Sequence, residues 1–278
     1  MKFTKMHGLG NDYVYVNCFD EPPPASPGDA ARVLSDRHFG VGGDGLILIQ
    51  PGKDGADAEM EMYNADGSKA EMCGNGLRCV VKYVYDQGIV KSKEMTVKTG
   101  AGILPVRVAK TRGDLAEEIE LNMGKPTLEG LKIPTTWDLP RVVNQSLDID
   151  GETFSVTCVS MGNPHCVIFV DDVASFPVER FGPLIENDAH FPNRVNVEFV
   201  EVVSSSAVKQ RTWERGTGET WACGTGASAV CVAGQLTERT GRDLTIHLTG
   251  GTLRLSSKDD DTVMLTGPAE EVFRGEID

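Results

Sequence analysis

Two cysteines carry the clearest chemical signal in this sequence, because each opens a Cys-Gly-x-Gly segment followed by an apolar stretch. The segments are Cys73 to Gly76 and Cys223 to Gly226. A thiol at a helix start faces the positive end of the helix dipole and several backbone N–H groups, and both favour the thiolate. The same N–H groups can hold a carboxylate, and the glycines let a ligand approach closely. Each segment alone predicts a reactive cysteine or an anion pocket.

An internal repeat relates the two segments. Tyr63-Asn64 begins ten residues before Cys73, and Trp213-Glu214 begins ten residues before Cys223, so the offset is 150 throughout. A second echo pairs Gly10-Asn11, before the apolar residues 13–16, with Gly162-Asn163, before residues 166–170. Repetition at a fixed separation indicates two similar halves, each leading from strands into a Cys-Gly-x-Gly helix start.

If the halves face one another, their helix starts converge on one ligand with a sulfur on each side. This arrangement suits the inversion of a carbon that bears a hydrogen, because a base removes the proton from one face and an acid delivers another to the opposite face. Helix-start N–H groups would stabilise charge that moves onto an adjacent carboxylate. Each sulfur should lie within ~3–3.5 Å of the carbon, which places the sulfurs roughly 6–7 Å apart. The pattern predicts an enzyme that moves a proton on and off a carbon.

Four of the remaining cysteines are expected to be structural. An odd count without a secretory signal argues against a disulfide framework, and the spacings match no zinc site, so we expect no metal. Cys79 and Cys231 lie inside the expected helices, and Cys18 and Cys158 lie in apolar strands, so all four are expected in the core. The seven cysteines are Cys18, Cys73, Cys79, Cys158, Cys166, Cys223 and Cys231.

Short alternating strands and few helices predict an α+β fold, because no regular strand–helix–strand alternation is present. The expected strands are residues 13–16, 46–49, 58–63 and 195–200, with hairpins over 96–108 and 244–255. The expected helices are residues 26–39, 75–87 and 225–240.

Length and charge narrow the function further. A chain of 278 residues suits two domains, expected over residues 1–118 and 119–267 with the charged stretch 110–118 as linker near Gly113. The net charge of −14 opposes a nucleic-acid partner. No apolar run reaches the ~18 residues of a membrane helix. With no targeting segment evident at the N-terminus, a cytoplasmic protein without membrane contact is expected.

Six segments of the sequence resemble the diaminopimelate epimerases, in family order from residue 6 to about 270. They are Met6 to Asp12, Tyr63 to Ser68, Cys73 to Gly76, Met161 to His165, Arg194 to Asn196, and Glu214 to Gly216 leading into Ala222 to Gly226. The resemblance implies two pseudo-symmetric domains, each a mixed β-sheet or barrel wrapped around a central helix, with the C-terminal segment 268–278 joined to the first. It implies a cofactor-independent interconversion of LL- and meso-2,6-diaminopimelate, in the route to lysine and peptidoglycan.

The resemblance also assigns roles to residues. Cys73 and Cys223 would be the two acid/base thiols, assisted by His165 and Glu214. Arg215 would clamp a carboxylate, because its fork binds both oxygens. Backbone N–H groups would hold the carboxylate beside the reacting carbon, at Gly74, Asn75, Gly224 and Thr225. The other substrate contacts would come from Asn11, Asn64, Asn163, Asn196, Glu214 and Arg215. A turn role for any single Asn and a structural role for His165 remain open.

Two positions depart from the family pattern. Gly45 stands where some members have Gln, so it is left out of the predicted site. Phe273 stands where some members have a Tyr associated with dimerisation, and a homodimer involving Phe273 is still expected.

Three other readings stay open. A proline racemase or hydroxyproline epimerase would share the fold, but the pattern of those enzymes has His after the first Cys-Gly, where this chain has Asn75. A non-catalytic amino-acid-binding protein would not need both thiols. A single-cysteine nucleophilic enzyme with His165 as base would leave the other segment unexplained.

Overall fold

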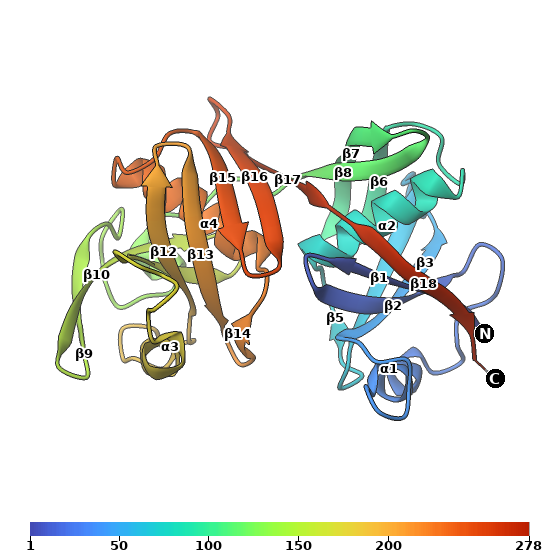
Figure 1. Ribbon diagram of the computed structural model, residues 1–278, viewed down its shortest axis with the longest axis horizontal. Helices are drawn as coiled ribbons and strands as arrows, with labels where there is room; N and C mark the ends of the chain where they lie inside the picture. Colours follow the sequence, from blue (N-terminus) through green and yellow to red (C-terminus); the bar gives the residue numbers. More distant parts are fainter. Residues whose placement is uncertain (278) are drawn as a thin grey trace. The chain divides into compact units, whose positions relative to one another are not determined.

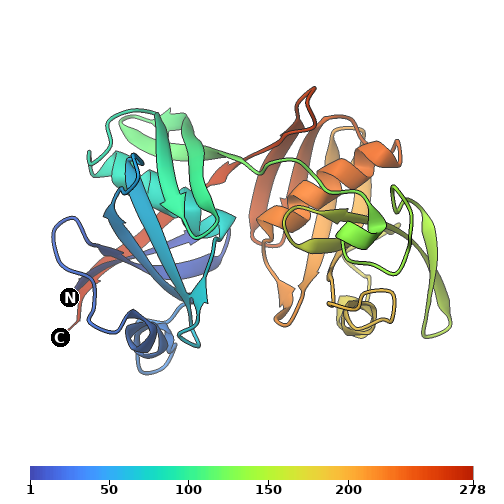
Figure 2. The ribbon, with the colours of Figure 1, turned by 180° about the vertical axis from the view of Figure 1, so that it is seen from behind.

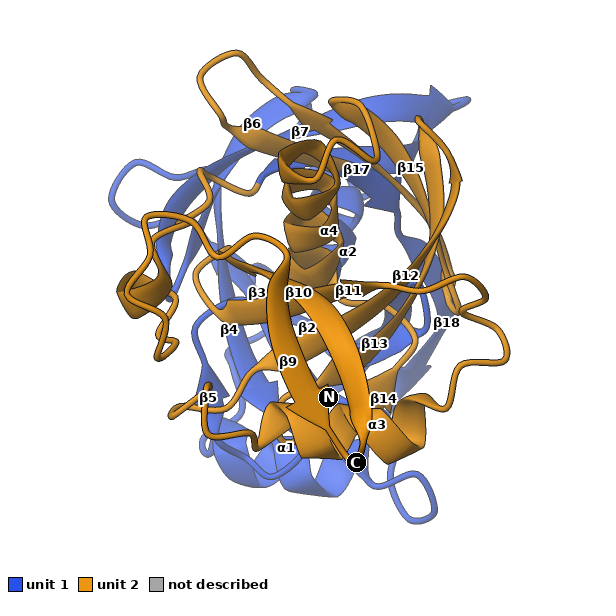
Figure 3. Ribbon diagram, turned by 90° about the vertical axis from the view of Figure 1, so that its left-hand side faces the viewer, with its two compact units in different colours: residues 1–122, 266–278 blue, residues 123–265 orange. Residues whose placement is uncertain are grey.

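The computed structural model describes residues 1–277 and divides into two compact units (Figures 1 and 3). Unit 1 consists of Met1–Asn122 and the chain from Thr266 onward, and unit 2 consists of Met123–Leu265. The N-terminal residue is tied into unit 1, because Met1 and Ile277 exchange backbone hydrogen bonds of 2.7 and 3.0 Å. The end of the chain therefore completes the unit that its beginning started.

Unit 1 combines a mixed sheet with two helices. Its elements are β1 (Lys2–Gly8), β2 (Asn11–Asn17), α1 (Pro27–Ser35), β3 (Gly45–Pro51), β4 (Ala58–Asn64), β5 (Lys69–Ala70), α2 (Gly74–Asp86), β6 (Glu94–Thr99), β7 (Gly102–Arg112), β8 (Leu115–Asn122) and β18 (Glu270–Glu276). β1 pairs antiparallel with both β2 and β18, β2 pairs parallel with β3, and β4 pairs parallel with β6. Helix α2 contacts β1, β2, β4, β7 and β8, so the strands surround it.

Unit 2 repeats this order. Its elements are a short 3-10 helix (Gly130–Lys132), β9 (Gln145–Ile149), β10 (Glu152–Ser160), β11 (Pro164–Phe169), α3 (Val178–Glu186), β12 (Asn196–Ser204), β13 (Ala207–Glu214), β14 (Gly218–Thr220), α4 (Gly224–Leu236), β15 (Asp243–Leu248) and β16 (Gly251–Ser257), and β17 (Val263–Pro268) leads back to unit 1. The parallel pairs β11–β12 and β13–β15 correspond to β2–β3 and β4–β6. The predicted α+β fold of two pseudo-symmetric halves around central helices is confirmed (Figure 2).

The central helices begin where the sequence predicts. Cys73 and Cys223 are the N-cap residues of α2 and α4, and each has extended backbone angles. Helix α4 consists mostly of small residues and is buried from Gly226 to Gly234, which fits a helix enclosed by strands. Its predicted end at Thr240 is wrong, because the backbone of Glu238 is left-handed with a φ of 57° and Arg239 N donates back to Gly234 O at 2.8 Å, which ends the helix at Leu236.

Three other expectations about local structure are wrong. Helix α1 ends at Ser35 rather than near Phe39, because the Asp36 side chain accepts the next N–H groups at 2.7 and 2.8 Å and forms a turn. The expected linker 110–118 is a hairpin of β7 and β8 with Gly113 at its turn. Cys18 is half-buried in the turn after β2, whereas Cys158 is buried in β10 as predicted.

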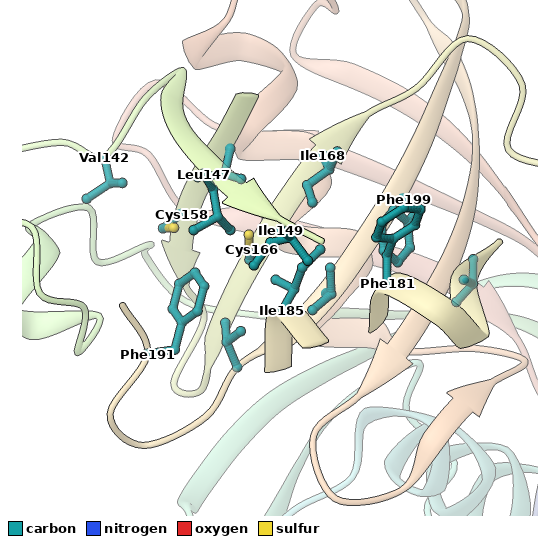
Figure 4. Close-up of a cluster of buried hydrophobic side chains, with 14 of the residues drawn as sticks. Val142, Leu147, Ile149, Cys158, Cys166, Ile168, Phe181, Ile185, Phe191 and Phe199 are labelled. Atoms are coloured by element: carbon teal, nitrogen blue, oxygen red, sulfur yellow. The ribbon is translucent and has the colours of Figure 1, made fainter. Parts of the chain in front are cut away.

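The core of unit 2 is a cluster of aliphatic and aromatic side chains between its strands and α3 (Figure 4). Phe199 on β12 is fully buried, and its ring centre lies 4.6 Å from that of Phe176. Cys158 and Cys166 face one another across β10 and β11 within this cluster. Helix α3 was not predicted, because Gly182 and Pro183 lower its helix propensity. The close approach of α3 to Trp213 explains why residue 182 is a glycine, since a Cβ at Gly182 would lie 2.6 Å from the Trp213 ring.

Candidate active site

The first half of the candidate site surrounds Cys73 at the start of α2. Its Sγ accepts a hydrogen bond from Gly76 N at 3.4 Å and lies 3.4 Å from Asn11 Oδ1. The first helical hydrogen bond runs from Leu77 N to Cys73 O, so the N–H groups before it are directed out of the helix start. The sulfur and the N–H groups predicted to hold a carboxylate therefore share one end of α2.

Two side-chain amides beside Cys73 are fixed in orientation. Asn11 Nδ2 donates to Asp44 Oδ2 at 2.6 Å, which turns Asn11 Oδ1 toward the sulfur and toward Asn75 Nδ2 at 3.3 Å. Asp44 is itself paired with Arg37 at 3.1 Å. The structure thus brings the predicted residues Asn11, Cys73 and Asn75 together, and Asp44 joins them although the sequence analysis did not select it.

Arg78 is the second residue of this half-site that the sequence analysis missed. It is fully buried, and its guanidinium donates to Asn75 Oδ1 at 2.9 Å and to Pro268 O at 3.0 Å. Among residues 1–277 no carboxylate forms an ion pair with it. The signal available in the sequence was a lone arginine beside Leu77, on the apolar stretch of a predicted helix.

Burial decides the proton affinity of Cys73. Removal from water raises the pKa of the Cys73 thiol, while the N–H groups of Gly76 and Asn75, the Tyr13 hydroxyl and the Arg78 charge partly offset the rise. Tyr13 is also buried, and its burial together with the nearby Cys73 raises the pKa of Tyr13 far above its ordinary value. The N–H groups of the helix start therefore favour the thiolate, as the sequence predicts, but burial outweighs them in the protein without ligand.

The second half of the candidate site surrounds Cys223 at the start of α4. Its Sγ accepts from Gly226 N at 3.4 Å, as the Cys73 sulfur does from Gly76, and lies 3.5 Å from Thr225 Oγ1. Glu214, at the end of β13, is held by Thr220 Oγ1 at 2.5 Å.

His165 lies between two oxygen atoms in the same unit. Its Nδ1 is 2.8 Å from Glu198 Oε1, and its Nε2 is 2.9 Å from Asn163 Oδ1. His165 and Glu198 have no exposed side-chain surface, and Glu198 Oε2 has no hydrogen-bond partner within the described residues. The sequence analysis selected His165 and Asn163 but missed Glu198. A single acidic residue inside the apolar run Val195 to Val200 was the signal.

Glu198 also lies close to the second thiol. A Cβ built on Gly226 would sit 2.6 Å from Glu198 Oε1 and 3.3 Å from Cys223 Sγ, so the two atoms are at most about 5.9 Å apart. Burial, Glu214 and Glu198 raise the pKa of Cys223 well above its ordinary value. Burial and Glu198 also raise the pKa of Glu214, against the opposing effect of Thr220. This half-site is rich in negative charge.

The repeat allows the two half-sites to be compared residue by residue. Val14 pairs with Leu46 as Cys166 pairs with Val197, so His165 corresponds to Tyr13 and Glu198 corresponds to Ile47. The same register makes Asn196 the counterpart of Gly45. At the offset of 150, Ser228 is the counterpart of Arg78. The thiols have equivalent backbone positions but different charged neighbours.

The other predicted residues of unit 2 form a hydrogen-bonded group. Asn196 Nδ2 donates to Pro164 O at 2.8 Å, and its Oδ1 accepts from Arg215 N at 3.0 Å. The exposed Arg215 guanidinium donates to Asn193 O at 3.1 Å. The structure therefore places Asn196 and Arg215 next to Glu214 but leaves the arginine side chain on the surface.

Two positions in unit 1 differ from the simple expectation of a substrate contact. Asn64 donates to Ser68 Oγ at 3.0 Å within the turn after β4, rather than to the Asn11–Asn75 pair. Gly45 has no room for a side chain, because a Cβ there would lie 2.1 Å from Tyr63 O. The backbone at Gly45 therefore excludes a glutamine unless the strands move apart.

Metal sites and membrane-spanning helices have no candidate within the part of the chain that the structure describes. Within residues 1–277, no group of three or more His, Cys, Asp or Glu side chains could hold a metal ion. No helix in the described chain has the length and apolar character needed to cross a lipid bilayer.

Comparison with known proteins gives consistent matches along the whole chain. A family model described as diaminopimelate epimerase matches residues 3–129 and 157–272. The diaminopimelate epimerase of Leptospira biflexa is 49% identical over 280 residues, covering 100% of this chain and 99% of the relative. That of Brachyspira hyodysenteriae is 50% identical over 280 residues with the same coverage. The two half-sites therefore lie in segments shared with these relatives.

Solved structures share the fold at much lower identity. A probable proline racemase from Agrobacterium radiobacter has a TM-score of 0.68 and 14% identity, covering 100% of this chain and 92% of the other. A hydroxyproline epimerase from Agrobacterium vitis has a TM-score of 0.67 and 15% identity, covering 100% and 90%. A Bacillus anthracis phenazine biosynthesis protein of the PhzF family has a TM-score of 0.71 and 15% identity, covering 100% and 98%.

Proposed function

This chain belongs to the diaminopimelate epimerase family, and we propose that Cys73 and Cys223 are the two acid/base groups with which it interconverts LL- and meso-2,6-diaminopimelate. The protein is an isomerase of lysine biosynthesis. The reaction requires only that a proton leaves one face of an α-carbon and another arrives on the opposite face. Two thiols provide both groups, so no cofactor is needed.

The observation that carries the proposal is the matched geometry of the two thiols. Each is the N-cap of the central helix of its unit, and each sulfur accepts the N–H of the second glycine at 3.4 Å. Buried structural cysteines have no reason to recur at equivalent helix starts. Cys79 and Cys231, inside the same helices, are fully buried and show the ordinary structural role.

In the proposed reaction, one sulfur acts as thiolate and takes the α-proton, so that it becomes a thiol. The other sulfur begins as a thiol and gives its proton to the opposite face, so that it becomes a thiolate. The carbanion charge moves onto the adjacent carboxylate, which the N–H groups of Gly74, Asn75, Gly224 and Thr225 would hold. The reverse reaction exchanges the roles of the two sulfurs, and the proton count is unchanged.

Glu214 and His165 are proposed to assist Cys223. Burial and Glu214 raise the pKa of the Cys223 thiol, and burial also raises the pKa of Glu214, so Glu214 can accept a proton near neutral pH more readily than an ordinary carboxylate. His165 is buried against Glu198 and Asn163, which supports a role in holding charge near Cys223. Both groups lie in unit 2, and this agrees with an assisting role at the second thiol.

The rest of the substrate is proposed to bind through neutral amides and one cation. The distal amino-acid end carries both charges, and their burial is costly unless each is paired. Asn11, Asn64, Asn163 and Asn196 would contact this end without adding net charge. The exposed Arg215 guanidinium would clamp the distal carboxylate, since substrate is a better partner than the single carbonyl of Asn193.

A homodimer in the cytoplasm is proposed for the functional form. Phe273 and Val272 on β18 are 46% and 55% exposed, and Phe273 packs edge-on against Phe3 at 6.0 Å. An apolar strand surface of this kind supports pairing with a second copy. All seven cysteines are free, which supports a reducing compartment.

The test measures epimerisation of LL-diaminopimelate by Cys73→Ala and Cys223→Ala, with Cys79→Ala and Cys231→Ala as matched controls on the same helices. Loss of activity in both N-cap variants, with activity kept in both controls, supports the proposal. Full activity in either N-cap variant contradicts it. Proline is assayed beside diaminopimelate, and turnover of proline alone would assign the chain to the other reaction of this fold.

A further inference from the structure

Arg78 is a buried cation that the proposed reaction does not yet use. Its side chain is fully buried, and no carboxylate among residues 1–277 pairs with it. A buried charge is costly unless it is paired or hydrogen-bonded, and arginine keeps its proton under these conditions. Its hydrogen bonds go to the Asn75 amide and to the carbonyls of Pro268 and Gly74, at 2.9, 3.0 and 3.5 Å.

A chain of hydrogen bonds connects Arg78 to the first thiol. Asn75 Nδ2 donates to Asn11 Oδ1 at 3.3 Å, and the same oxygen lies 3.4 Å from Cys73 Sγ. Arg78 therefore fixes the Asn75 side chain and places a full positive charge behind the helix start that carries Cys73. Gly8 on β1 keeps the guanidinium there, since a Cβ at Gly8 would lie 2.9 Å from Arg78 Nη2.

The equivalent position in unit 2 is neutral. Ser228 is buried there, and its hydroxyl donates to Gly224 O at 2.9 Å. Near Cys223 the charged groups are instead the carboxylates Glu214 and Glu198, with His165 between Glu198 and Asn163. The repeat thus places a cation at one thiol and two acids at the other.

We propose that Arg78 is a positioning residue that makes Cys73 lose its proton at a lower pH than Cys223 in the free enzyme. This inference deepens the proposed function and rests on it. A thiolate at Cys73 gains from the buried guanidinium, whereas one at Cys223 would lie within about 5.9 Å of the Glu198 carboxylate. Epimerisation then starts from a defined distribution of one proton between two sulfurs.

The other groups that face Cys73 do not reverse this preference. Tyr13 and Tyr15 on β2 and Cys79 on α2 are buried, and burial raises the pKa of each, so they stay neutral near pH 7. Asp44 is neutralised by Arg37 at 3.1 Å. One contact opposes the proposal, because Asn11 Oδ1 at 3.4 Å favours the thiol. The effect of one amide dipole at this distance on the thiolate is weaker than the effect of a full buried charge.

The test is the pH dependence of alkylation by iodoacetamide at each cysteine, followed by peptide mass spectrometry without substrate. In the native enzyme, the alkylation midpoint of Cys73 should lie below that of Cys223. In Arg78→Met, the Cys73 midpoint should rise by at least one pH unit, which lowers its reaction rate at a pH below the midpoint about tenfold. Cys223 should be unaffected, and Arg78→Lys should restore most of the difference.

Lys82→Met is the matched control, because Lys82 lies one turn further along α2 and is already paired with Asp86 at 2.7 Å. It should leave both midpoints in place. A native Cys223 midpoint below that of Cys73 would overturn the proposal, and this comparison needs no variant. An unchanged Cys73 midpoint in folded Arg78→Met would also overturn it. Failure of the proposed function would appear separately, as absent turnover of diaminopimelate by the native enzyme.

Discussion

Replacing Glu198 by Gln should make Cys223 ionise at lower pH, because the substitution removes a buried negative charge close to its sulfur. The side chains are almost isosteric, and Gln can still accept from His165 Nδ1, so the fold should be kept. Glu198 Oε1 lies at most about 5.9 Å from Cys223 Sγ. At an effective dielectric constant of about 20, two unit charges at this distance repel by about 2.8 kcal/mol.

That repulsion corresponds to a shift of about two pH units in the ionisation of the thiol. The sign follows from the charges: an acid near a thiol disfavours the thiolate, so its removal lowers the pKa of Cys223. The assay is the midpoint of Cys223 alkylation against pH, resolved by peptide mass spectrometry. A fall of at least one unit is expected in Glu198→Gln.

Glu201→Gln provides the control, since Glu201 lies on the same strand but is paired with Lys209 at 2.7 Å. This variant should leave the Cys223 midpoint unchanged. A midpoint that stays in place or rises in Glu198→Gln would refute the electrostatic reasoning, because no arrangement of the remaining groups could supply the lost repulsion. Equal shifts in both variants would show a general effect of net charge instead.

Three further outcomes concern stability. Gly45→Ala should lower the free energy of unfolding by about 1–3 kcal/mol in a denaturant titration, since its Cβ would lie 2.1 Å from Tyr63 O; Gly241→Ala should be near neutral, because its nearest neighbour atom is 3.6 Å away. Phe199→Ala should cost about 3–5 kcal/mol by the same measurement, and a loss under 1 kcal/mol would contradict the described core of unit 2. Burial raises the pKa of the Asp12 carboxyl, but the two cations bound to it, Arg37 and Lys5, lower the pKa by more, so the net shift is downward. The stabilisation that Asp12 provides is therefore present above about pH 3.8, the ordinary pKa of an aspartate, and is lost as the pH falls through the lowered value, so Asp12→Asn should flatten the acid limb of a Tm-against-pH curve.

The sequence predicted those features that depend on local patterns. The starts of α2 and α4 follow from an N-cap thiol, flanking glycines and an apolar face, all of which lie within a few residues of each other. The internal repeat predicted two similar halves because duplicated segments kept their spacing. The ends of α1 and α4 were missed, since the Asp36 side chain stops α1 through hydrogen bonds and the left-handed backbone of Glu238 stops α4.

The charged neighbours of the thiols could not be predicted from local patterns. Glu198 reaches His165 only because β11 and β12 pair in parallel with one particular register. Arg78 reaches Pro268, 190 residues away, only because the end of the chain returns to unit 1. Such contacts depend on the tertiary fold, whereas an isolated acid or base in an apolar segment indicates only that some partner is required.

The proposed reaction requires two sulfurs to act on opposite faces of one carbon, and this claim is tested most directly by deuterium incorporation. LL-diaminopimelate is incubated with the native enzyme in D2O, and both isomers are recovered after a small fraction has reacted. A two-base mechanism predicts deuterium at the inverted carbon of the meso product, while the recovered LL substrate stays unlabelled. A product that keeps its original hydrogen, or a recovered substrate labelled as heavily as the product, would contradict the claim.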